Sequence, residues 1–168
     1  MPVSQIPAAG ISSVSATTVS SGTLPAAQAV SGSIIQVAQY LNYTYASTTN
    51  SSFTATGYAV TITPKSATST MLIRCALSGS QSASNGGGYF TVYRNGSNLA
   101  GANGYNTIYT NASFSNPFRI PVVIELTNAS SGTSAITYEI YFKTNTVGTV
   151  ALNQDSTASS ITVMEIAP

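Results

Sequence analysis

The residues of this chain that could carry chemistry are few, because the sequence contains no histidine and only one cysteine. Without histidine, neither a Ser-His-Asp triad nor a Cys-His pair can form. Most zinc sites also need histidine or several cysteines, so the sequence excludes them. The single thiol, Cys75, lies in the run 71–77, in which alternate residues are hydrophobic. This position predicts a buried and unreactive thiol.

Carboxylates are the remaining candidates for acid–base chemistry, since a glycosidase needs only two of them. The chain has four, Glu125, Glu139, Asp155 and Glu165, scattered over separate predicted strands and a loop. Glu139 alternates in the same phase as Lys143, as on an exposed strand face. Asp155 could hold calcium together with backbone carbonyls, but no acidic loop of known spacing surrounds it. We therefore predict a protein that is not an enzyme, with no catalytic residues, no metal site and no cofactor.

Tyrosine is the abundant aromatic residue, with ten copies against five phenylalanines and no tryptophan. Tyrosine among serine, glycine and asparagine is typical of adaptable recognition surfaces, because rigid aromatic area lies beside flexible hydrogen-bonding groups. Segment 101–116, GANGYNTIYTNASFSN, has this composition. It predicts a recognition loop in which Tyr105, Asn106, Tyr109 and Asn111 are the contact residues. The alternative is a plain loop between strands.

Charged side chains are scarce and begin late, the first being Lys65. They make up 5% of the chain, whereas an average domain has about 25%. The net charge of +1 gives no electrostatic reason to expect nucleic acid or an anionic membrane as a partner. We also find no apolar run of membrane-spanning length and no pattern of a signal peptide. Because charge usually keeps free monomers apart, this composition predicts a chain that works inside an assembly.

Residues 1–31 differ from the rest of the chain, because they contain no charge and no sustained hydrophobic period. Serine, threonine and valine dominate, which disfavours helix and predicts an extended or disordered arm. The phrases QIPAAG and TLPAAQ repeat an apolar residue followed by Pro-Ala-Ala. Ile6-Pro7 and Leu24-Pro25 are therefore candidate anchors in grooves of a partner, with chance repetition as the alternative.

From residue 32 onward, short runs with a period of 2 alternate with turn residues, a pattern typical of β-strands. The dipeptide Asn95-Gly96 predicts a type I′ hairpin turn. Pro121 cannot donate to a strand ladder, so its strand should lie at an edge or contain a bulge. No segment leaves room for a helix of several turns. We predict a single all-β domain over residues 32–168, an antiparallel β-sandwich of jelly-roll type.

Two of these runs alternate most clearly. Segment 33–45 places Ile35, Val37, Leu41, Tyr43 and Tyr45 on one face of the predicted strand. Segment 135–144 separates two sets of alternate residues: Ile136, Tyr138, Ile140 and Phe142 on one face, and Thr137, Glu139, Tyr141 and Lys143 on the other.

Several phrases in this part of the chain resemble a family of small β-rich virion proteins and fibre-tip domains of tailed phages, especially phages of cyanobacteria. They are GSIIQVAQY, VTITPKSATSTMLIRC, YFTVYRNGSNL, SSGTSAITYEIYFKT and the ending ITVMEIAP. The resemblance covers residues 32–168 in order and leaves out the arm. It implies a β-sandwich head on the virion surface, commonly a homotrimer, without catalysis.

Two functions fit these patterns. In the first, the chain is a capsid decoration (cement) protein on the exterior of the virion, whose arm binds the major capsid protein and whose head contacts further copies. In the second, it is a tail-fibre or receptor-binding tip that recognises host cell-surface glycan through segment 101–116. A short arm in front of a compact head favours the first.

Overall fold

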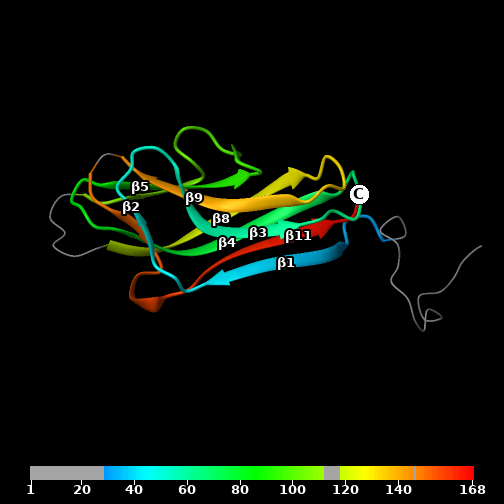
Figure 1. Ribbon diagram of the computed structural model, residues 1–168, viewed down its shortest axis with the longest axis horizontal. Helices are drawn as coiled ribbons and strands as arrows, with labels where there is room; N and C mark the ends of the chain where they lie inside the picture. Colours follow the sequence, from blue (N-terminus) through cyan, green and yellow to red (C-terminus); the bar gives the residue numbers. More distant parts are fainter. Residues whose placement is uncertain (1–28, 112–117, 146) are drawn as a thin grey trace, which may run out of the picture.

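The computed structural model describes residues 29–111, 118–145 and 147–168, which form two antiparallel sheets packed against each other (Figure 1). The predicted antiparallel β-sandwich is therefore confirmed. These ranges contain eleven strands and one 3-10 turn: β1 Ile34–Asn42, β2 Ala46–Thr48, β3 Thr54–Ile62, β4 Thr70–Gln81, β5 Gly87–Arg94, β6 Ser97–Asn98, β7 Asn106–Tyr109, β8 Phe118–Ala129, β9 Ile136–Thr144, β10 Val150–Leu152, η4 Gln154–Ser156 and β11 Ser159–Ile166. Within them, no helix is long and apolar enough to cross a membrane.

The first sheet is built around β4. This strand pairs with β8 along its whole length, from Thr70 opposite Ala129 to Gln81 opposite Phe118. On its other side β4 pairs first with β11 and then with β10. Strands β1 and β2 flank β11 and β10, respectively. In the part of the chain that the structure describes, β8 and β1 are thus the long edge strands of this sheet.

The second sheet runs in the order β3, β9, β5, with β6 and β7 both pairing to the far side of β5. Its central strand β9 follows the alternation seen in the sequence, because successive side chains of a strand point to opposite faces. The core-facing set is buried, and the set that contains Tyr141 and Lys143 is half-buried on the outer side.

The hydrophobic core lies between the two sheets and draws on both. Its largest fully buried apolar side chains are Tyr138, Phe90, Phe142, Met71, Ile73, Ile108, Ile140, Leu152, Ile161 and Val92. Burying a side chain of this kind stabilises the fold by about 1.5–3 kcal/mol relative to leaving it exposed. The core therefore fixes the strands that carry every surface described below.

Two local predictions are confirmed. Asn95 and Gly96 both have positive φ, 46° and 82°, as a type I′ turn requires, and they join β5 to β6. Pro121 lies on β8, which among the described strands pairs with β4 alone, so the proline occupies an edge strand. The jelly-roll subtype and the extended arm stay predictions.

Candidate functional site

The predicted arm anchors Ile6, Pro7, Leu24 and Pro25 lie outside the described residues, so their role stays a prediction. The described chain starts beside the C-terminal end of the domain. The N–H of Gly32 donates to the carbonyl of Ala167 at 3.1 Å, in line with the pairing of β1 with β11. The first described residues therefore lie at the same end of the sandwich as the last ones.

The predicted recognition loop is in part a strand, so the loop prediction is wrong for β7. The strand pairs with β5 and sends alternate side chains to opposite sides. Ile108 is 1% exposed and belongs to the core, whereas Tyr109 is 60% exposed. Asn106 shares the phase of Ile108, and its Nδ2 donates to the carbonyl of Val123 at 3.3 Å. The structure thus separates Asn106 from the tyrosine that was predicted to act with it.

Tyr105 and Asn111 flank this strand. The hydroxyl of Tyr105 donates to the carbonyl of Leu99 at 2.8 Å, and its backbone N–H donates to the carbonyl of Phe90 at 2.9 Å. Its side chain remains 40% exposed, and Asn111 is also exposed. Tyr105 is therefore held in place by the loop that follows β6, while retaining accessible ring surface.

The outer side of the second sheet carries a set of tyrosines that the sequence did not predict as one site. Tyr89 and Tyr93 lie in the outward phase of β5, and the register places Tyr141 of β9 opposite Thr91 between them. Tyr109 lies opposite Gly87 at the outer strand β7. We call Tyr89, Tyr93, Tyr109 and Tyr141 the tyrosine face. Alternation in the sequence indicated the outward phase of Tyr141, but the pairing of β5 with β9 had no local signal.

Two rings of the tyrosine face contact each other. Tyr93 and Tyr141 stack with their centroids 3.7 Å apart and their planes at 14°. Phe53, in the loop before β3, meets Tyr93 edge-on at 6.4 Å. Offset-stacked and edge-on rings are the arrangements that aromatic quadrupoles favour. This part of the surface is thus pre-organised by its own contacts.

A single cation completes the tyrosine face. The Nζ of Lys143 lies 4.7 Å from the ring centroid of Phe53 and 5.1 Å from that of Tyr89. It also donates to the carbonyl of Ala102 at 2.6 Å. The ammonium therefore holds the loop after β6 against the aromatic rings.

Tyr141 of this face and the nearby Tyr105 have phenols whose pKa values are raised. Burial raises the pKa of Tyr141, and the charges of Glu139 and Tyr93 raise it further. Burial also raises the pKa of Tyr105. A protonated phenol can both donate and accept a hydrogen bond. Tyr141 and Tyr105 therefore offer flat aromatic area and hydroxyls for binding.

The four carboxylates are each engaged by a different partner. Glu125 lies 3.9 Å from Arg74, and Asp155 lies 2.6 Å from Arg119, in two half-exposed ion pairs. Glu139 accepts a backbone hydrogen bond at the edge of the second sheet. In the described ranges no three potential metal ligands come together.

Glu165 is the carboxylate whose environment is most unusual, because it is fully buried at the end of β11. Burial raises its pKa, but hydrogen bonds outweigh this effect and the pKa is lowered overall. The carboxylate accepts from the backbone N–H groups of Lys65 and Ser66 at 2.8 and 3.1 Å and from the amide of Gln36. It therefore fastens β1 and the loop after β3 to β11. The alternation of hydrophobic residues in the last strand did not show which face Glu165 lies on, so the sequence did not predict its burial.

Cys75 lies in the core with no exposed surface, as predicted. Burial raises the pKa of its thiol to about 12. Since the thiolate is the nucleophilic form, this thiol is unreactive in the folded protein.

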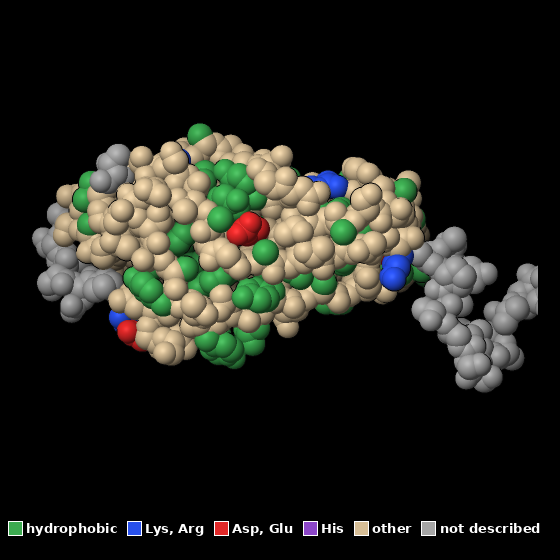
Figure 2. All heavy atoms as spheres, in the orientation of Figure 1, with side chains coloured by type: hydrophobic (Ala, Val, Ile, Leu, Met, Phe, Trp, Pro, Cys, Tyr) green, Lys and Arg blue, Asp and Glu red, His purple; other side chains and the backbone are tan. Residues whose placement is uncertain are grey.

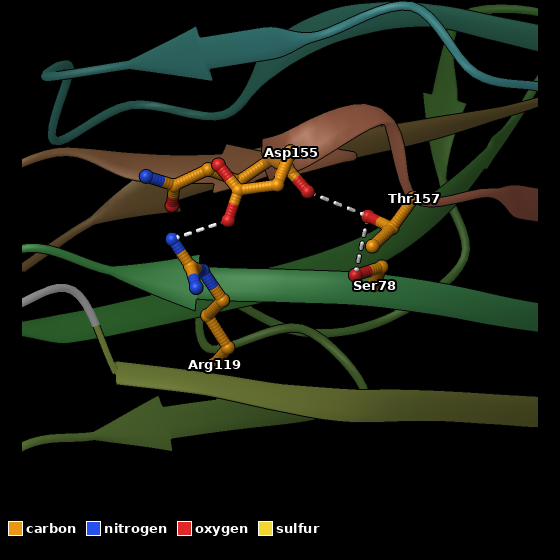
Figure 3. A network of polar contacts seen from close by, with 5 residues as sticks. Ser78, Arg119, Asp155 and Thr157 are labelled. Atoms are coloured by element: carbon orange, nitrogen blue, oxygen red, sulfur yellow. Dashed lines mark hydrogen bonds and ion pairs between the residues drawn. The ribbon is translucent and has the colours of Figure 1, made fainter.

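A shallow hollow of about 470 Å³ lies on the outer side of the first sheet, over β4, β8 and the turn before β11. Its lining is largely apolar and includes Val123. At one end the guanidinium of Arg119 meets Asp155, and the hydroxyls of Thr157 and Ser78 lie 2.8 Å apart (Figure 3). Because the ion pair satisfies both charges, the hollow presents mainly aliphatic surface.

The turn that carries Asp155 is held in an uncommon backbone conformation. Asn153, Asp155 and Ser156 all have positive φ, between 56° and 59°. Asn153 is buried, and its amide donates to the carbonyl of Asn42 at 2.7 Å and to the hydroxyl of Tyr58 at 3.1 Å. These bonds compensate the cost of left-handed backbone and fix Asp155 over β8.

No protein-family model matches the chain, and no curated protein matches it. The basis for a functional proposal is therefore the surface of the sandwich, together with the resemblance of its sequence segments to phage virion proteins.

Proposed function

We propose that the protein is a structural component of a phage virion, a capsid decoration (cement) protein that binds and stabilises the capsid lattice. The surface of the sandwich supports this proposal. Eleven large hydrophobic residues are exposed among the described residues, whereas the whole chain has nine charged side chains, of which Glu165 is buried. Figure 2 shows hydrophobic side chains spread over the face in view, with few charged groups among them. Such a surface favours a chain that is covered by partners in an assembly.

The strand order is consistent with a head of jelly-roll type. Apart from the short strands β2, β6 and β10, the first sheet has the order β1, β11, β4, β8, and the second has the order β3, β9, β5, β7. Two four-stranded antiparallel sheets of this kind are the layers of a jelly roll, a fold used in viral capsid domains. We infer this subtype from the order in which the chain crosses between the sheets.

The arm supplies the attachment to the shell in this proposal. Extended segments bind by adding a strand to a partner's sheet edge and by placing anchors such as Ile6-Pro7 and Leu24-Pro25 in pockets. Many weak contacts repeated over a symmetric lattice give strong overall attachment. The partners are the major capsid protein and copies of the chain itself, in the homotrimer that the resemblance implies, on the exterior of the virion.

The experiment that tests this function is the copy number of the chain in purified particles, measured by mass spectrometry against the major capsid protein. A decoration protein is present in numbers comparable to the capsid protein. A handful of copies per particle would instead place the chain on the tail, and its absence would overturn both virion functions.

Removal of residues 1–28 tests the arm while leaving every described residue in place. We expect a folded head, with an unchanged circular dichroism spectrum, that no longer sediments with undecorated shells. Undiminished shell binding by this truncated chain would show that the arm is not the anchor.

A second candidate function, a tail-fibre or receptor-binding tip, is supported by the tyrosine face. Aromatic rings beside hydroxyl and amide groups suit the recognition of glycan on a host surface. Tyr109→Ala should then weaken binding to host polysaccharide, and Tyr43→Ala is the matched control, because both side chains are 60% exposed on different parts of the sandwich. Equal binding by the two variants and the unmodified chain would argue against this function.

A further inference from the structure

The exposed hydrophobic residues are concentrated at the beginning of the described chain. Of the eleven large ones that the described residues expose, seven fall within residues 30–45, in and around β1. Six of them form what we call the β1 surface: Val30, Ile34, Val37, Leu41, Tyr43 and Tyr45. The seventh, Tyr40, points into the sandwich, opposite the buried Ile161.

Strand β1 carries the aliphatic residues Val37 and Leu41 on the side away from the core. Val37 lies opposite Met164 and Leu41 lies opposite Ser160, in the outward phase of β11, and they are 58% and 50% exposed. The core-facing phase of β1 instead contains Gln36, Ala38 and Tyr40. A strand of a monomeric sandwich normally has the reverse arrangement. The distribution of aliphatic residues in β1 is therefore typical of a strand whose outer side is covered by a partner.

The free edge of β1 also lacks charged residues and proline, which protect many edge strands. Among the described strands, β1 pairs with β11 alone and leaves its other edge unpaired over nine residues. Natural sheets protect such an edge with lysine, proline or a covering segment. β1 contains no lysine and no proline, the first charged residue in the sequence is Lys65, and the one register shift of the strand, between Ile34 and Gln36, lies at its start. An edge of this composition is suited to pairing with another chain.

We propose that the β1 surface is the contact between copies of this chain. Its six residues are each 50–79% exposed, so together they offer an apolar area on the order of the ~800 Å² that each partner contributes to a standard interface. The surface is uncharged, so a second copy matches it without any charge left unpaired. On the same side of the sheet, Arg74 and Glu125 lie on β4 and β8 and pair with each other. This inference deepens the proposed assembly role, but its test does not need the capsid.

The test is the mass of the full-length chain in solution, measured by sedimentation over a concentration series. The unmodified chain should sediment as a multimer, and Val37→Lys or Leu41→Lys should weaken self-association by about tenfold or more, since each buries an unpaired ammonium in the contact. Val123→Lys is the matched control. Val123 is 52% exposed on the outer side of the same sheet, at the opposite edge strand β8, and its substitution should leave the mass unchanged.

Three outcomes would overturn the proposal. The first is an unmodified chain that is monomeric at every concentration. The second is a multimer that both β1 variants retain with unaltered affinity while unfolding at the same temperature as the unmodified chain. The third is a monomer whose β1 variants lose binding to capsid shells, which would assign the β1 surface to the capsid protein and leave the proposed function intact.

Discussion

The outer side of the first sheet presents aliphatic side chains, and the outer side of the second sheet presents tyrosines. On the first sheet Val37, Leu41 and Val123 are each at least half exposed, and they lie on strands at both edges. On the second sheet Tyr93 and Tyr141 are half-buried, because they stack on each other. Both sides follow from the same alternation along strands, with different residues in the outward phase.

This difference separates a surface that needs a partner from one that is already organised. Exposed aliphatic groups gain free energy when another surface covers them, at roughly 25 cal/mol for each Å² removed from water. The tyrosines have formed ring–ring and cation–ring contacts within the chain, so a ligand finds them pre-positioned and less ordering is required. The first sheet is thus suited to lasting contact between chains, and the second to reversible binding of a smaller ligand.

The largest effect should come from Gly104→Ala, which disrupts the loop that organises the tyrosine side. Gly104 has a φ of +70°, and a methyl group there would collide with the carbonyl oxygen of Phe90 and crowd the ring of Phe53. We expect a loss of about 2–4 kcal/mol in the free energy of unfolding, since strain and a backbone clash combine. Chemical denaturation followed by tyrosine fluorescence measures this loss.

The control for this prediction is Gly101→Ala in the same loop. No atom lies within 4 Å of a methyl group built at Gly101. This variant should unfold at the denaturant concentration of the unmodified chain, within error. Equal stability of the two variants would show that the loop after β6 adapts freely and does not fix the tyrosine side.

Glu165→Gln should have the next largest effect, and it acts on the strand that carries the aliphatic side. The hydrogen bonds from Lys65, Ser66 and Gln36 hold the folded-state pKa of this carboxyl below its ordinary value of 4.5. The carboxylate therefore contributes stability that is complete above the ordinary pKa and is lost as the pH falls through the lowered one. At neutral pH the substitution should cost about 1–3 kcal/mol.

Unfolding experiments at a series of pH values from neutral to acid measure this contribution. The gap between the unmodified chain and Glu165→Gln should narrow as the pH falls below the ordinary glutamate pKa. Glu125→Gln, on the same sheet but in a half-exposed ion pair, should cost less than about 1 kcal/mol at neutral pH. A gap of constant size at all pH values would mean that the charge of Glu165 contributes nothing.

Local sequence patterns were sufficient for the sandwich, the hairpin at Asn95-Gly96 and the edge position of Pro121. Each of these depends on alternation or on the backbone preferences of one or two residues. The same alternation identified Tyr141 and Lys143 as outward residues of β9. Composition misled at Asn106 and Tyr109, because a short strand with one buried residue looks like a polar loop in sequence.

What the sequence could not provide depends on pairing between distant segments. The burial of Glu165 is compensated by the backbone of Lys65 and Ser66, about a hundred residues earlier, which donates to it. Likewise, the shared face of Val37 and Leu41 was visible in the sequence, but its outward direction follows from the register of β1 on β11. Alternation defines two phases of a strand and leaves open which of them meets the core.

The smallest effect is the coupling between Tyr93 and Tyr141, and it measures how strongly the tyrosine side is pre-organised. Replacing each residue with alanine, singly and together, gives a double-mutant cycle for the free energy of unfolding. Stacked rings at 3.7 Å should show a coupling of about 0.5–1.5 kcal/mol beyond their separate losses. Tyr141 combined with Tyr43, which lies on the β1 surface, should be additive, because the two residues share no contact across the sandwich. A coupling near zero in the stacked pair would mean that the tyrosines are as independent of one another as the valines on β1 and β8. The outer side of the second sheet would then be no more pre-organised than that of the first.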